Sequence, residues 1–362
     1  MDTPSASVLI LFLAAILATL SKLKLPTKIP HLSSEKISVG STVSKKGYEE
    51  VVNRFLSEIS FQIPDLEFDT KLKVRVEDSL ESHGVSRRFI AKVEPCISTA
   101  TKITSFSYPF ASAEVQEAIA LYAAYVISID DTLEEMTSHL ESYGTELVLG
   151  QTHRHELLRG FTSLLSNQQR LFGKFGGDMV IKNSIEFISS VIIEQRQNGL
   201  RLSHDTSDYL DYFRIKTGVA ESFAFFCFPE NINPENQDLA KYITAIPSIN
   251  SFLGYVNDML SFYKEELEEG DCPGYIESHA KVHGTTLLQS LDQLRVKTVD
   301  EIRKIRSILS DDAIMLERIN QFIHGYIFYH LCASRYRLNE LNIPIALEAK
   351  SRFREMLKVR TQ

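Results

Sequence analysis

The 362-residue sequence has no tryptophan and only four cysteines, and each scarcity narrows what the protein can be. The cysteines form no CxxC pair, so neither a disulfide framework nor a zinc site is expected, and a reducing compartment fits. The net charge is −8 and no run rich in Lys or Arg occurs, which disfavours nucleic acid as a partner. Without tryptophan, any aromatic lining of a binding site must come from phenylalanine and tyrosine.

One nearly apolar run, residues 8–20, is too short to span a bilayer as a helix. It reads VLILFLAAILATL, which is well below the roughly 20 residues that a helical span requires. No basic residue precedes it, as a secretory signal would require, whereas Lys22, Lys24 and Lys28 follow it. We therefore expect a cytoplasmic protein. In it the run either associates weakly with the cytosolic face of a membrane or packs on the surface without any membrane role.

The rest of the chain has the pattern of one helical domain. Residues 21–47 are rich in Ser, Lys, Pro and Gly, which is the composition of a linker. We therefore assign residues 1–47 to an N-terminal apolar segment with its linker, and residues 48–362 to a folded domain. Beyond residue 48 apolar side chains recur at helical spacing, and the alternation typical of strands is scarce. The pattern predicts a single, large all-α domain.

Three oxygen-bearing side chains, Asn257, Ser261 and Glu265, recur at intervals of four residues. On an α-helix each such step drifts about 40° around the axis and rises about 6 Å, so the three form a ladder on one face. An amide oxygen, a hydroxyl and a carboxylate suit Mg²⁺, which prefers oxygen and is usually completed by substrate phosphates. Lys264 could add a positive charge beside the same phosphates. The alternative is a solvated polar stripe on an ordinary amphipathic helix.

A second acidic motif ends the apolar stretch 121–131. Asp130 and Asp131 close this stretch, and Glu134 and Glu135 follow. Carboxylates at the end of a hydrophobic helix are unfavourable when buried without a partner, and a helix C-terminus itself disfavours negative charge. The placement becomes favourable if Mg²⁺ or Arg meets the carboxylates there. The alternative is a helix that ends at the surface with its acids exposed.

Together the motifs resemble those of the class I terpene cyclases, above all the trichodiene synthase-like branch of fungal sesquiterpene cyclases. Residues 257–265, NDMLSFYKE, match the N-D-x-x-S-x-x-x-E motif of that branch, at the expected distance from Asp130. The segment HLCASRYRL, residues 330–338, matches the one that carries an Arg-Tyr pair. Upstream, FRIKTG, residues 213–218, matches an arginine and a glycine at a helix break. The resemblance covers roughly residues 50–362.

This resemblance implies an all-α, single-domain class I terpenoid synthase: a helical bundle around a central active-site cavity, with residues 48–362 as the catalytic domain. It implies three Mg²⁺ ions. Asp130 would bridge two of them, and Asn257, Ser261 and Glu265 would hold the third. The residues that would donate hydrogen bonds to the substrate diphosphate are Arg214, Lys264, Arg335 and Tyr336.

The resemblance also implies roles outside the metal site. Asp131 would pair with Arg335 when the site closes, and Thr217 and Gly218 would lie where a helix opens. Glu134 stands where the family usually has aspartate, which leaves its own role in doubt. Some of the aromatic residues near the motifs would line the cavity, the candidates being Tyr122, Tyr125, Phe223, Phe225, Phe226, Phe322, Tyr326 and Tyr329.

The activity that the resemblance implies is that of a lyase, a Mg²⁺-dependent sesquiterpene cyclase. Such an enzyme ionises farnesyl diphosphate, cyclises the carbocation to a hydrocarbon or alcohol, and releases diphosphate. The branch is commonly homodimeric. One alternative is a chain-elongating prenyl diphosphate synthase, but that class has an aspartate-rich second motif where this chain has the Asn-Ser-Glu set. The other is a catalytically silent isoprenoid-binding relative, against which the intact metal ligands argue.

Overall fold

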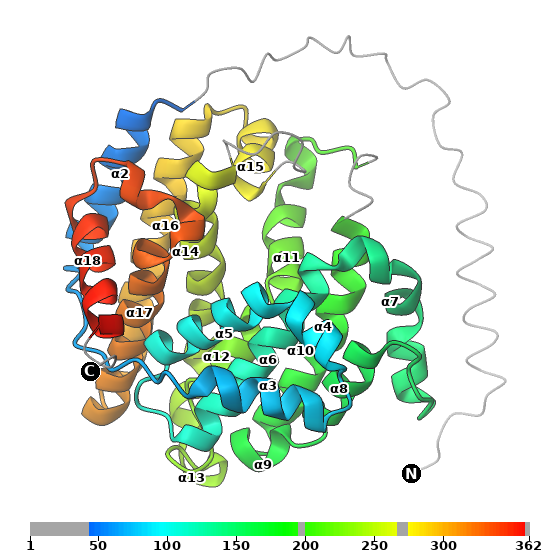
Figure 1. The fold of residues 1–362 in the computed structure, drawn as a ribbon. Coiled ribbons are helices and arrows are strands. Elements are labelled where there is room, and N and C mark those ends of the chain that lie inside the picture. Colours follow the sequence, from blue (N-terminus) through cyan, green and yellow to red (C-terminus); the bar gives the residue numbers. More distant parts are fainter. Residues whose placement is uncertain (1–42, 195–199, 266–273, 359–362) are drawn as a thin grey trace, which may run out of the picture. The chain divides into compact units, whose positions relative to one another are not determined.

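The computed structural model describes residues 43–194, 200–265 and 274–358, all in one compact unit. Within these ranges it consists of α-helices and short 3₁₀ turns without any strand, so the predicted all-α single domain is confirmed (Figure 1). The helices are α2 (Lys45–Glu58), α3 (Leu72–Ser82), α4 (Arg87–Lys92), α5 (Glu94–Ser107), α6 (Ala113–Asp131), α7 (Leu133–Val148), α8 (Glu156–Leu165), α9 (Gln168–Phe172), α10 (Lys174–Glu194), α11 (Ser207–Thr217), α12 (Ala220–Phe225), α13 (Glu235–Tyr242), α14 (Ile246–Glu265), α15 (Tyr275–His283), α16 (Leu287–Ile308), α17 (Ala313–Cys332) and α18 (Pro344–Lys358).

Local capping signals set the start of the helices that later carry functional side chains. The Ser112 hydroxyl accepts a hydrogen bond from the backbone N–H of Val115 at the start of α6, at 3.4 Å. At the start of α17, the Asp312 carboxylate accepts one from the backbone N–H of Met315, at 3.1 Å. Each cap satisfies a backbone donor that has no partner within the first helical turn. The two helices therefore begin at residues fixed by their own sequence.

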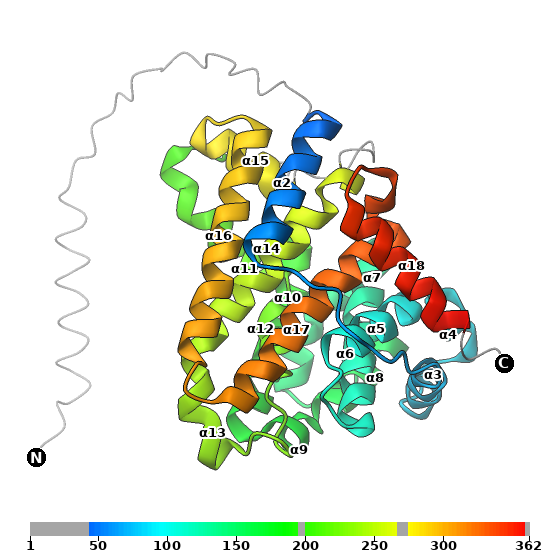
Figure 2. The same ribbon diagram turned by 90° about the vertical axis from the view of Figure 1, so that its left-hand side faces the viewer.

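Helices α5, α6, α10, α11, α14 and α17 surround the centre of the bundle (Figures 1 and 2). Contacts join α5 to α6, α10 to α11, α11 to α14, α14 to α17, and α17 back to α5. The packing of α17 on α5 depends on Gly325, because a Cβ there would lie 1.8 Å from the carbonyl oxygen of Phe106. A larger residue at this position would force two walls of the bundle apart.

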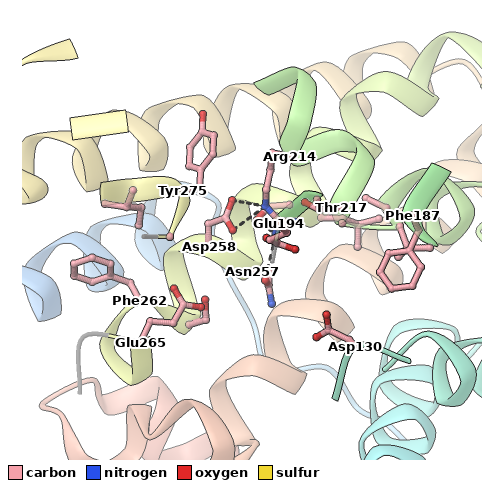
Figure 3. A pocket seen from close by; sticks show the side chains of 18 of the residues that line it. Asp130, Phe187, Glu194, Arg214, Thr217, Asn257, Asp258, Phe262, Glu265 and Tyr275 are labelled. Atoms are coloured by element: carbon pink, nitrogen blue, oxygen red, sulfur yellow. Dashed lines mark hydrogen bonds and ion pairs between the residues drawn. The ribbon is translucent and has the colours of Figure 1, made fainter. Parts of the chain in front are cut away.

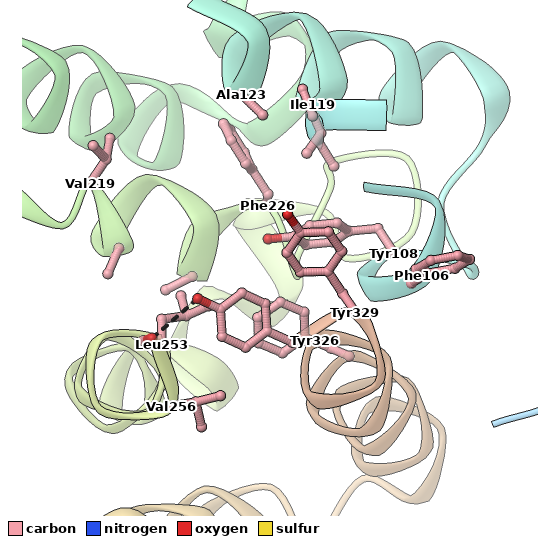
Figure 4. Close-up of a cluster of buried hydrophobic side chains, with 14 of the residues drawn as sticks. Phe106, Tyr108, Ile119, Ala123, Val219, Phe226, Leu253, Val256, Tyr326 and Tyr329 are labelled. Atoms are coloured by element: carbon pink, nitrogen blue, oxygen red, sulfur yellow. Dashed lines mark hydrogen bonds between the residues drawn. The ribbon is translucent and has the colours of Figure 1, made fainter. Parts of the chain in front are cut away.

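Aromatic side chains fill much of the space between α5, α14 and α17 (Figure 4). Two of them also satisfy their hydroxyls on backbone carbonyls. Tyr326 Oη donates to the carbonyl of Leu253 at 3.2 Å, and Tyr108 Oη donates to that of Phe223 at 2.8 Å. A buried tyrosine is stable only when its hydroxyl has a partner. These bonds therefore fix the position of rings that belong to the core and also line a cavity.

The predicted N-terminal apolar run, residues 8–20, lies outside the described residues. The described part begins just before α2, whose first residue Lys45 lies close to the predicted domain start at Tyr48. The hydroxyl of Ser44 caps this helix by accepting from the backbone N–H of Gly47 at 3.1 Å. In the three described ranges, none of the helices combines the length and apolar character needed to cross a membrane.

Candidate active site

A cavity of about 850 Å³ lies among the central helices, and nearly all of the predicted site residues line it (Figure 3). Its volume lies in the range of pockets for small organic ligands, about 300–1,000 Å³. The exception is Asp131, which ends α6 with an exposed side chain. The predicted residues that do line the cavity are Asp130, Arg214, Thr217, Gly218, Asn257, Ser261, Lys264, Glu265, Arg335 and Tyr336.

The oxygen ladder lies on α14 and faces this cavity. Ser261 Oγ is buried and makes no hydrogen bond of good geometry, although the Glu265 carboxylate, one turn further on, lies near enough to accept from it. A buried hydroxyl so weakly satisfied gains from a ligand. Burial raises the pKa of Glu265 because the charged form loses solvation, whereas the Ser261 hydroxyl lowers it. An amide oxygen, a weakly bonded hydroxyl and a poorly solvated carboxylate fit a hard cation such as Mg²⁺.

Asp130 lies across the cavity from the ladder (Figure 3). Its side chain is open to solvent through the cavity. The surrounding protein still reduces the solvation of the charged form and so raises the pKa of Asp130. The charge of Asp131 raises the pKa further, whereas Arg335, Lys264 and Arg214 lower it. The three cationic side chains that the family resemblance assigns to diphosphate binding therefore all act on the charge of one carboxylate, although they belong to three separate segments of the chain.

Another carboxylate in the cavity, Glu194, was missed by the sequence analysis. It is the last residue of α10, and burial raises its pKa, with the negative charge of Asp130 adding to the shift. Two carboxylates that disfavour each other's ionisation are stabilised by a cation between them. Glu194 is therefore a further candidate ligand. It could have been found, because it follows the apolar run VII in the same way that Asp130 follows its own apolar helix.

The candidate metal ligands do not form a compact cluster of acids and histidines. The part of the chain that the structure describes holds no group of three or more His, Cys, Asp or Glu side chains arranged to bind a metal ion. The ladder instead contributes amide and hydroxyl oxygens beside a single carboxylate. This donor set leaves several positions of an octahedral ion for water or phosphate oxygens, which is how Mg²⁺ is usually held.

Arg214 is anchored by Asp258, a residue of the motif to which sequence analysis gave no role. Arg214 Nε donates to both carboxylate oxygens of Asp258 at 2.9 Å, and Nη2 donates to Asn257 Oδ1 at 3.2 Å. Burial alone would lower the pKa of Arg214, but the charge and hydrogen bonds of Asp258 raise it. The guanidinium is thus held, charged, against the helix that carries the ladder (Figure 3).

The helix opens where the sequence predicts, between α11 and α12, but the backbone strain lies on another residue. Gly218 has a helical φ of −81°, whereas Val219 adopts the left-handed region with φ 50°. That conformation is unfavourable for a β-branched residue. Gly218 is needed for a different reason, since a Cβ there would lie 2.7 Å from Arg214 Nη1. The glycine therefore makes room for the guanidinium.

The Arg-Tyr pair lies in a 3₁₀ turn, Ser334–Tyr336, that directly follows α17. Arg335 stacks on the ring of its neighbour, with Cζ 5.5 Å from the ring centroid of Tyr336. Tyr336 is buried, and its ring also stacks on that of His330 with centroids 4.5 Å apart. Glu134, in contrast, is exposed on α7 outside the cavity lining, so it has no evident part in the site.

Only some of the candidate aromatic residues line the cavity. Phe223, Tyr326 and Tyr329 do so. The remaining five candidates do not belong to the cavity lining: Tyr122, Tyr125, Phe225, Phe226 and Phe322 are buried in the core. Tyr122, for example, points to α10 and α12, where its hydroxyl bonds to those of Ser184 and Ser222 at 2.9 and 2.8 Å. Aromatic lining that was not predicted comes from Tyr108, Phe187 and Phe213, among others.

Comparison with known proteins places this site in a family. A sequence profile of the trichodiene synthase (TRI5) family matches residues 78–361. A protein of Metarhizium brunneum named (E)-beta farnesene synthase is 35% identical over 300 residues, which are 83% of this chain and 91% of the relative. Trichodiene synthase of Fusarium cortaderiae is 25% identical over 251 residues, covering 69% of this chain and 66% of that protein.

A solved structure shows the same fold at much lower sequence identity. The crystal structure of linalool/nerolidol synthase from Streptomyces clavuligerus superposes with a TM-score of 0.56 at 11% identity, covering 75% of this chain and 99% of the other. The fold and the family profile therefore agree with each other. The chain belongs to the trichodiene synthase (TRI5) family of terpene synthases.

Proposed function

We propose that this terpene synthase is a Mg²⁺-dependent sesquiterpene cyclase that acts on farnesyl diphosphate, with residues 48–362 as its catalytic domain. The observation that carries the proposal is one cavity with two chemically distinct parts. The oxygen ladder of α14 and Asp130 face each other at one end, with Arg214, Lys264 and Arg335 beside them. Apolar and aromatic side chains make up most of the remaining lining, with polar residues such as Thr99, Ser107 and Glu277 among them. A prenyl diphosphate has the same division into an anionic head and an apolar tail.

The polar end would bind the diphosphate and assist its departure. Members of this family generally depend on Mg²⁺, and the candidate ligands are Asp130, Asn257, Ser261 and Glu265, which we propose hold three ions. Bound Mg²⁺ would neutralise negative charge that grows on the leaving diphosphate. Arg214, Lys264, Arg335 and Tyr336 would donate hydrogen bonds to the same group. Donors that bind the departing anion more strongly than the intact ester lower the barrier to ionisation.

The apolar end would protect and shape the carbocation. Tyr326, Tyr329 and Phe223 present rings to the cavity, and each aromatic face can stabilise a cation by roughly 0.5–2 kcal/mol. The hydroxyl of Tyr326 is already engaged with the carbonyl of Leu253. This bond fixes the ring of Tyr326 against α14. Exclusion of water is equally necessary, because water would quench the cation before it cyclised.

An open-chain product is a second candidate. β-Farnesene, for which the relative from Metarhizium brunneum is named, is an acyclic C15 hydrocarbon. Loss of a proton from the first farnesyl cation would give such a product without ring closure. Both outcomes share the ionisation step, so the polar end of the site supports them equally. The contour of the apolar end decides between them.

Product analysis tests the proposal. Purified protein is incubated with farnesyl, geranyl or geranylgeranyl diphosphate, with Mg²⁺ or with EDTA, and the organic extract is analysed by gas chromatography and mass spectrometry. We expect a C15 hydrocarbon or alcohol from farnesyl diphosphate only when Mg²⁺ is present. A cyclic skeleton supports the cyclase, and farnesene supports the open-chain alternative. No terpene product from any of the substrates would contradict both. A longer prenyl diphosphate made only with added isopentenyl diphosphate would show chain elongation.

A further inference from the structure

His330 lies next to the proposed metal site but does not line the cavity. It is fully buried near the end of α17, where Tyr326, Tyr329 and Tyr336 surround its ring at centroid distances of 4.6, 5.2 and 4.5 Å. Its two nitrogens have different partners. Nδ1 lies 2.8 Å from the carbonyl oxygen of Tyr326, and Nε2 lies 3.4 Å from Nδ2 of Asn257.

These partners determine which nitrogen carries the proton. A carbonyl oxygen can only accept a hydrogen bond, so Nδ1 of His330 must be the protonated donor to Tyr326. The amide nitrogen of Asn257 can only donate, so Nε2 must offer its lone pair. Both conditions are met by a single neutral tautomer. The imidazole is therefore a fixed acceptor directed at the side chain of Asn257.

The other end of the Asn257 amide is specified independently. Its Oδ1 lies 3.2 Å from Nη2 of Arg214, and a guanidinium has donors only. If the amide were rotated by 180°, two donors would meet at Arg214 and two acceptors would meet at His330. The Tyr336 hydroxyl also hydrogen-bonds to the Asn257 side chain, but a hydroxyl can donate or accept and so fits either orientation. The opposite requirements of Arg214 and His330 thus determine the orientation that the sequence leaves open. In this orientation the oxygen of Asn257 is directed at the polar end of the cavity, toward Arg214.

We propose that His330 is a positioning residue that holds the Asn257 amide with its oxygen toward the metal site. The inference rests on the proposed function, because it assigns Asn257 Oδ1 to Mg²⁺. His330 also supports the Arg-Tyr turn, since its ring stacks on that of Tyr336. One side chain of α17 thereby connects the ladder of α14 to a proposed diphosphate donor. Partners that orient a metal ligand typically change metal affinity by about 10- to 100-fold when removed.

The test compares two amide substitutions at this position. In His330→Gln, the longer side chain can place an amide oxygen near the position of Nε2 and accept from Asn257. In His330→Asn, the shorter side chain can reach only the position of Nδ1 and retains the Tyr326 contact alone. Binding is measured by calorimetric titration of inorganic diphosphate in the presence of Mg²⁺, without substrate. We expect His330→Asn to weaken binding by about 10- to 100-fold. His330→Gln should recover most of the affinity.

A second background separates positioning from packing. In Asn257→Ala no amide is left to orient, and no second acceptor is brought against Nε2 of His330. The loss caused by His330→Asn should therefore disappear in that background, whereas a loss of packing would persist there. Should His330→Asn fail to fold, His330→Phe takes its place. It retains a ring against Tyr336 but lacks both nitrogens, and the same loss is expected.

The outcomes distinguish the two proposals. Wild-type affinity in both His330→Asn and His330→Phe would overturn the role of His330 and leave the metal site intact. If His330→Asn caused the same loss in the wild-type and the Asn257→Ala backgrounds, His330 would be a packing residue, which also overturns the proposal. If the wild-type protein itself binds no diphosphate with Mg²⁺, the proposed function fails together with the inference.

Discussion

The ion pair between Arg214 and Asp258 should contribute measurably to the stability of the ligand-free protein. The side chains are only 19% and 12% exposed, and Arg214 cannot lose its charge at any ordinary pH. Removing one partner of a buried pair costs about 3–5 kcal/mol, because an uncompensated charge stays behind. Both side chains border a cavity, so we expect the lower end of this range for Asp258→Ala, about 3 kcal/mol. At about 2 °C per kcal/mol, the Tm should fall by about 6 °C.

The two single substitutions should not be equivalent. Arg214→Ala leaves a buried carboxylate, whose pKa is already raised by burial and which can become neutral by taking up a proton. It should therefore cost less than Asp258→Ala. The double substitution leaves no charge behind, so its cost should be well below the sum of the two single costs.

Urea unfolding followed by circular dichroism measures these free energies. The matched control is Asp300→Ala, which removes an exposed pair with Arg303, whose members are 50% and 67% exposed. Such surface pairs contribute at most about 1 kcal/mol. The reasoning is refuted if Asp258→Ala costs no more than Asp300→Ala. Strict additivity in the double substitution would refute it too, because it would mean that the two charges do not interact.

Further predictions concern the proposed metal and diphosphate site. Asp130→Ala and Asn257→Ala should each lower kcat/KM for farnesyl diphosphate by at least about 100-fold. The control is Glu134→Ala, because the Glu134 side chain is exposed outside the cavity lining. A wild-type rate in Asp130→Ala or Asn257→Ala would remove that residue from the metal site. Arg335→Lys should cost about 10-fold, since a planar two-pronged donor becomes a point charge, and an unchanged rate would show that charge alone suffices. Asp130→Asn should stabilise the metal-free protein at neutral pH. Loss of solvation raises the folded-state pKa of Asp130, which means that the folded protein favours the neutral carboxyl over the carboxylate. The contribution of this residue to folding stability is therefore fully present below about pH 4, and it is lost as the pH rises through the folded-state pKa. With EDTA, the Tm advantage of this variant should therefore grow from acid to neutral pH, and a constant difference would contradict the argument.

Several features could be predicted from the sequence because they depend on local geometry. Asn257, Ser261 and Glu265 share one face of any regular helix, whatever surrounds it. Asp130 and Asp131 close an apolar helix for the same local reason. The helix break at Gly218, directly after α11, was instead expected from the family resemblance. Helical periodicity and capping are properties of neighbouring residues. The all-α class and the ladder were therefore determined by the sequence alone.

The tertiary structure decided which groups meet. Arg214 and Asp258 are 44 residues apart, and Asn257 and His330 are 73 apart, so no local pattern indicates that they are in contact. Glu194 joins the cavity only because α10 ends beside Asp130. Whether an aromatic ring lines the cavity or fills the core likewise depends on how its helix is rotated against its neighbours. The sequence by itself determined the candidate ligands on each helix, whereas the packing of distant helices determined which side chains contact them and which charges act on them.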